Sequence, residues 1–69
     1  MIAKVYLWNN NAVTVFDENG AQIPEFQGML AQVKSLIIAN ADKATKFFLA
    51  SWQEATDKPI PREEFERME

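Results

Sequence analysis

The chain has 69 residues, 48% of them hydrophobic, and a formal net charge of −3 at pH 7. It contains no Cys and no His, which excludes disulfides, zinc sites with the usual ligands, and thiol or imidazole catalysis. A chain this short has room for one small core, so we expect residues 1–69 to form a single domain, and a homodimer is a reasonable way to stabilise it.

The mild acidity opposes non-specific binding to DNA and to anionic membranes. No apolar run approaches the ~20 residues that a membrane-spanning helix needs, and polar residues 9–11 follow too soon for a signal-peptide core. We therefore expect a soluble, cytoplasmic protein without a membrane partner.

Residues 2–8 and 12–17 are rich in β-branched and aromatic side chains, which predicts two strands. The three asparagines between them tolerate the positive φ angles of a tight turn, so the strands should form a hairpin. Alternation gives each strand two faces. One face is aliphatic, with Ala3, Val5, Leu7, Val13 and Val15, and the other is mixed, with Ile2, Lys4, Tyr6, Trp8, Thr14 and Phe16.

Residues 17–20 read Asp-Glu-Asn-Gly, a second hairpin turn signal, after which residues 21–23 can pair back as a short strand. Apolar residues then recur at helical spacing from Phe26 to Ala41, and this pattern predicts a central amphipathic helix over about residues 25–41. Pro24 suits the entry to that helix.

Two templates fit residues 42–55. As a strand, about 46–52, this segment alternates Phe47 and Leu49 against Phe48, Ala50 and Trp52; as a helix, 43–55, it would give a ββαα arrangement. We favour the strand because an isolated hairpin is marginal and needs a third strand. Residues 53–58 read as a polar connection, and Pro61 followed by acidic residues predicts a short helix over about 61–68. The predicted fold class is α+β.

If the helix covers the aliphatic face, the opposite face presents too much aromatic surface to stay bare. Its members form the candidate interaction face: Lys4, Tyr6, Trp8, Phe16, Lys46, Phe48 and Trp52. Three occupants are open: the C-terminal segment through Ile60, Phe65 and Met68; a protein partner or second copy; and single-stranded nucleic acid, with bases stacked on the rings and lysines on phosphates.

Catalysis, metals and cofactors are not expected. Neither Ser35 nor Ser51 has an adjacent base, and no Gly-rich phosphate loop occurs. The 17–20 turn lacks the acidic spacing of an EF-hand calcium loop. The carboxylates near the C-terminus read as a solvated face, with the alternative that they mimic a phosphate backbone and inhibit a basic partner. These are Glu63, Glu64, Glu66 and Glu69.

Three stretches, at residues 13–20, 23–28 and 61–65, resemble the small uncharacterised proteins encoded by phages and prophages. This resemblance implies a genomic setting and assigns no site residue. The sequence as a whole predicts a non-catalytic protein-interaction module, able to form a homodimer through its aromatic sheet face. Nucleic-acid binding, which the acidic charge disfavours, is the alternative.

Overall fold

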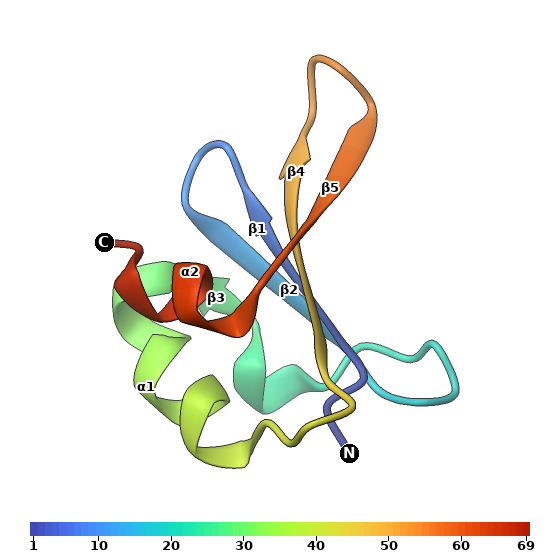
Figure 1. Cartoon of the computed structure of the whole chain (residues 1–69). Helices are drawn as coiled ribbons and strands as arrows, with labels where there is room; N and C mark the ends of the chain where they lie inside the picture. The colour runs from blue at the N-terminus through green and yellow to red at the C-terminus, as the bar shows by residue number, and fades with distance from the viewer.

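The computed structural model describes the backbone of residues 1–69 and the side chains of all of them except Thr56. It is an α+β fold in which two helices pack on a five-stranded sheet with the strand order β3-β2-β1-β4-β5 (Figure 1). The strands are β1 (Lys4–Trp8), β2 (Ala12–Phe16), β3 (Gly28–Met29), β4 (Lys46–Ser51) and β5 (Thr56–Ile60); the helices are α1 (Leu30–Asn40) and α2 (Arg62–Arg67), preceded by a single 3-10 turn, η1 (Pro24–Phe26).

The predicted hairpin is confirmed as β1 and β2, which pair antiparallel with Tyr6 opposite Thr14. Its turn uses the asparagines as expected: Asn11 has a φ of 67°, and the Asn10 side-chain oxygen accepts the N–H of Ala12 at 3.1 Å. After α1 the chain returns as β4, parallel to β1, with Tyr6 beside Phe48. A helical crossover joins these parallel central strands.

The central helix begins five residues later than predicted, at Leu30, and ends at Asn40. The physical reason lies at Gly28, which has a φ of 148° and pairs with Val13 as part of β3. A side chain there would be strained and would meet Gln32 at 3.3 Å. The predicted strand at 21–23 is reduced to a single bridge between Phe16 and Gln22.

The third predicted strand is confirmed as β4, and the helical alternative for residues 43–55 is wrong. The polar connection predicted after it is wrong in part, because residues 56–60 form β5, paired antiparallel with β4. Pro59 argues against a strand in the sequence. However, β5 lies at the edge of the sheet, where a residue without an N–H can be accommodated because no further strand needs that hydrogen bond. The terminal helix, predicted at 61–68, is α2.

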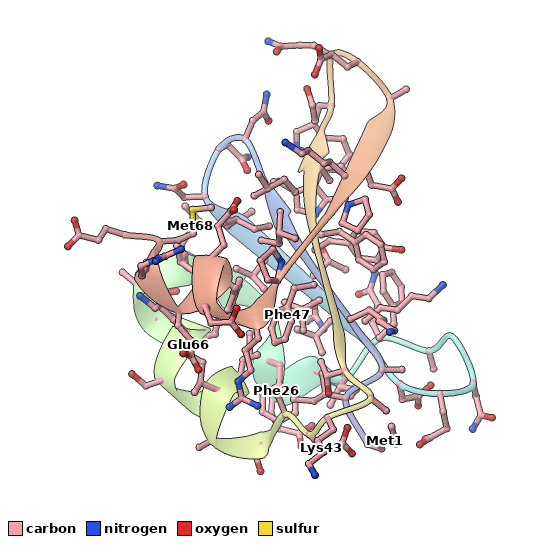
Figure 2. All side chains as sticks on the ribbon, in the orientation of Figure 1. Met1, Phe26, Lys43, Phe47, Glu66 and Met68 are labelled. Carbon is pink, nitrogen blue, oxygen red and sulfur yellow. The ribbon has the colours of Figure 1, made fainter. Side chains whose placement is uncertain are left out.

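The buried core lies between the sheet and both helices. Ile2 belongs to it, against the prediction that placed this residue on the opposite face; β1 begins two residues later, so strand alternation does not apply to Ile2. Figure 2 shows the Phe47 side chain directed toward α2. The buried members of the core are Ile2, Val5, Leu7, Val13, Val15, Leu30, Val33, Ile37, Phe47, Ile60 and Phe65.

Thr45, the buried polar residue between α1 and β4, ties this connection to the start of β1. Its hydroxyl donates to the carbonyl of Ile2 at 2.7 Å and accepts the N–H of Asp42 at 3.1 Å. Thr45→Val keeps the shape and removes both bonds, so we expect the free energy of unfolding to fall by about 2 kcal/mol in urea denaturation. Thr45→Ser, which keeps the hydroxyl, should lose much less. Equal stability of the Val variant and the wild type would contradict this role.

Candidate interaction face

The side of the sheet turned away from α1 and α2 carries the predicted aromatic residues. Paired residues on neighbouring strands point to the same side, so the register places Lys4, Tyr6 and Trp8 of β1 beside Lys46, Phe48 and Ala50 of β4. Phe16 pairs with Lys4 across the hairpin. We call this surface the aromatic face; it comprises Lys4, Tyr6, Trp8, Phe16, Lys46, Phe48 and Trp52, and the structure brings all of them together.

Tyr6 lies at the centre of a cluster of aromatic rings. Its ring stacks on Phe48 with a centroid distance of 4.9 Å and an interplanar angle of 17°, and it meets Phe16 edge-on at 5.6 Å. Both arrangements are favourable for aromatic quadrupoles. Tyr6 and Phe48 therefore each cover one ring face of the other, and all three rings of this group are half-buried.

Trp8 and Trp52 form the second part of the cluster. Their rings stack at 3.9 Å with an interplanar angle of 15°, and the indole N–H of Trp8 donates to the Thr14 hydroxyl at 3.0 Å. Trp8 is thus fixed from two sides. Trp52, in the turn between β4 and β5, remains 64% exposed although it is fully apolar except for its N–H. A large exposed aromatic side chain that stacks on a fixed neighbouring ring is typical of a binding surface.

The C-terminal segment does not cover this face, so this one of the three possible occupants is wrong. Ile60 pairs with Phe47, which directs both side chains to the helix side, and Phe65 stacks near Phe47 with a centroid distance of 4.8 Å. Met68 packs against the same core. Figure 1 shows α1 and α2 together on one side of the sheet, with the β4–β5 hairpin extending beyond them.

Two residues of β5, which sequence reasoning missed, lie beside the aromatic face. Asp57 pairs with Ala50 and Pro59 pairs with Phe48, which places both on the aromatic side of the sheet edge. Asp57 also lines a shallow hollow of about 430 Å³ together with the rings of Tyr6, Trp8 and Trp52. The signal that could have revealed them is weak, because β5 is short and contains a proline.

The two acidic segments have local roles. The Asp17 carboxylate accepts the backbone N–H groups of Asn19 and Ala21 at 2.9 and 3.0 Å, so it closes the 17–20 turn. On α2, Arg62 pairs with Glu66 at 3.0 Å, and Arg67 follows, so this helix does not present a uniformly acidic surface.

Among the residues that the structure describes, no group of three or more His, Cys, Asp or Glu side chains is placed to hold a metal ion. Nor do the described residues include a helix long and apolar enough to cross a membrane. Comparison with known protein families, with curated proteins and with solved structures finds no match to this chain.

Proposed function

We propose that this chain is a non-catalytic protein-interaction module that binds its partner through the aromatic face. The observation that carries the proposal is the placement of both helices on one side of the sheet, which leaves five clustered aromatic residues uncovered on the other. Aromatic anchors that are already held in one conformation lose little entropy on binding. Such residues are typical of the centres of protein interfaces.

The stacking within the cluster favours a protein partner over nucleic acid. A base binds an aromatic platform through a free ring face, whereas Tyr6 and Phe48 each use one ring face on the other, and Trp8 uses one on Trp52. Trp52 alone among the five rings is exposed. The lysines that would meet phosphates, Lys4 and Lys46, lie at the far end of the strands from Trp52 in a chain of net charge −3.

The remaining expectations about setting rest on the sequence. A cytoplasmic location stays a prediction made from the sequence. A phage or prophage origin stays a prediction carried by the resemblance of residues 13–20, 23–28 and 61–65. Inhibition of a basic partner by the acidic residues of α2 is the weaker functional alternative, because its arginines interrupt the charge.

A photoreactive phenylalanine analogue introduced at Trp52 tests the proposal in cells that express the chain. We expect adducts of defined mass from position 52. An adduct with another protein should be abolished by excess wild-type chain and not by excess Trp52→Glu chain, a variant that stays folded because the indole is exposed. An adduct with a second copy should have the mass of two chains and should persist when excess wild-type chain supplies that copy. The same analogue at Leu36, which is 45% exposed on α1, is the matched control and should give no such adduct. Equal labelling from both positions, or none from position 52, would contradict the proposal.

A further inference from the structure

Opposite charges lie at opposite ends of the aromatic face. Lys4 and Lys46 are side by side at one end, since they pair in the parallel register of β1 and β4. Asp57 lies at the other end, beside Ala50 and close to the Trp8 position. These ends are separated by four residues of β1, or about 13 Å. None of the three charges is in an ion pair among the described side chains.

Large and small side chains are also distributed unequally between the two ends. The row at the lysine end carries Phe16, Lys4 and Lys46, all of them large. The row at the Asp57 end carries Trp8 between two small residues, Ala12 and Ala50, with Ala12 one place beyond the Leu7–Val13 pair, and Trp52 stacks on Trp8 at this end. Tyr6 and Phe48 occupy the row between them. In charge, and along β2 from Phe16 to Ala12, the face is thus complementary to itself when its two ends are exchanged.

We propose that the occupant of the aromatic face is a second copy of this chain, packed sheet to sheet about a two-fold axis that runs across the strands along the Tyr6–Phe48 row. This inference deepens the proposed function and depends on it. Such a rotation exchanges the two ends and keeps each strand opposite its own copy, as an isologous interface requires. Sheets stacked in this way lie about 10 Å apart with interdigitated side chains.

The rotation brings groups of complementary charge or size from the two copies into contact. Phe16 lies over the partner's Ala12, and Lys46 lies next to the partner's Asp57. Lys4 lies over the stacked pair of the partner's Trp8 and the partner's Trp52, where a cation is attracted to the face of an indole ring. The hollow of about 430 Å³ beside Asp57 gives the lysine side chains room to enter. Each contact occurs twice by symmetry.

The area available predicts a dimer of moderate affinity. The five rings expose roughly 300 Å² together, by the areas typical of aromatic side chains, whereas a stable interface buries about 800 Å² on each partner. Lysine stems, Pro59 and Met29 must supply the rest. Association should therefore appear at micromolar protein concentrations and not at nanomolar ones.

Sedimentation equilibrium from about 1 μM to about 1 mM tests the inference on the full chain. We expect the wild type to pass from its 7.9 kDa monomer to a species of twice that mass. Lys4→Glu combined with Lys46→Glu sets like charges against Asp57, and Asp57→Lys sets like charges against the lysines. Each variant should associate about tenfold or more weakly than the wild type.

The decisive measurement is an equimolar mixture of these two variants. In the mixed pair the introduced carboxylates meet the introduced lysine at one contact and the native charges meet at the other, so association should return toward the wild-type value. Lys43→Glu combined with Lys58→Glu makes the same change in net charge off the aromatic face and should leave association unchanged. Circular dichroism confirms that each variant is folded.

A wild type that stays monomeric up to about 1 mM overturns the inference. So does a dimer that the substitutions weaken but the mixture does not restore, since the ends of the face would then not be exchanged. A monomer whose Trp52 position still gives a competable adduct with another protein leaves the proposed function intact. A monomer without such an adduct contradicts both.

Discussion

Phe65→Ala should lower the free energy of unfolding by about 4 kcal/mol. Phe65 is 0% exposed and is the sole buried residue of α2, a helix of six residues that is too short to be stable by itself. Its ring packs 4.8 Å from that of Phe47. Removing it leaves a cavity over β4. The C-terminal segment is then held by the packing of Met68 and by two hydrogen bonds with α1, from Arg62 to the Ile38 carbonyl and from Lys34 to the Met68 carbonyl.

The whole domain has about 3 to 10 kcal/mol of stability by the usual range per residue. The loss therefore should lower the thermal midpoint by roughly 15 °C or more, measured by circular dichroism at fixed protein concentration. Phe65→Leu, which keeps most of the volume, should cost about 1 kcal/mol. Leu36→Ala, at a position 45% exposed on α1, should change stability little. Similar losses for Phe65→Ala and Leu36→Ala would show that α2 does not close the core.

The elements that could be predicted are those whose signals are local. The asparagine turn and the alternation of Val5 to Leu7 and Val13 to Val15 determine the first hairpin without reference to the rest of the chain. β4 is predictable because a hairpin needs further strands, and α2 is predictable because Pro61 and the following acidic residues mark a helix start. In each case the neighbouring residues and the tertiary structure favour the same conformation.

The elements that could not be predicted depend on pairing between distant residues. β5 contains Pro59 and polar residues, and it is a strand because β4 offers it a free edge. That pairing sets Ile60 beside Phe47, so α2, which follows Ile60, lies on the same side of the sheet as α1. Strand alternation within residues 56–60 could not reveal this. The start of α1 likewise depends on the pairing of Gly28 with Val13. Long-range contacts override local propensity here.

The sequence is enough to predict which residues form the aromatic face, but not whether that face is exposed. Alternation alone assigns Tyr6, Trp8, Phe16 and Phe48 to one side of the sheet. Whether that side is covered depended on the course of the C-terminal segment. Asp57 was missed for the same reason, although it supplies the charge that makes the face complementary to itself.

Gln27→Ala should lower the free energy of unfolding by about 2 to 3 kcal/mol, because this side chain takes the place of a strand residue at the edge of β2. Its amide oxygen accepts the N–H of Val15 at 3.1 Å, and its amide nitrogen donates to the carbonyls of Val15 and Ile23, both at 2.8 Å. β3 is two residues long and pairs with Ala12 and Val13 only. The side chain of Gln27 thus continues the ladder where the backbone of β3 does not reach.

Urea denaturation of three variants separates this role from packing. Gln27→Met keeps the length and apolar volume of the side chain and loses the hydrogen bonds, so it should be nearly as unstable as Gln27→Ala. Gln22→Ala, at an exposed glutamine of the same connection, should stay within about 0.5 kcal/mol of the wild type. Amide hydrogen exchange gives the local readout: the Val15 N–H should exchange much faster in the Met variant, while the N–H groups of β4 follow only the global loss of stability. Recovery of wild-type stability by methionine would mean that Gln27 acts by filling space.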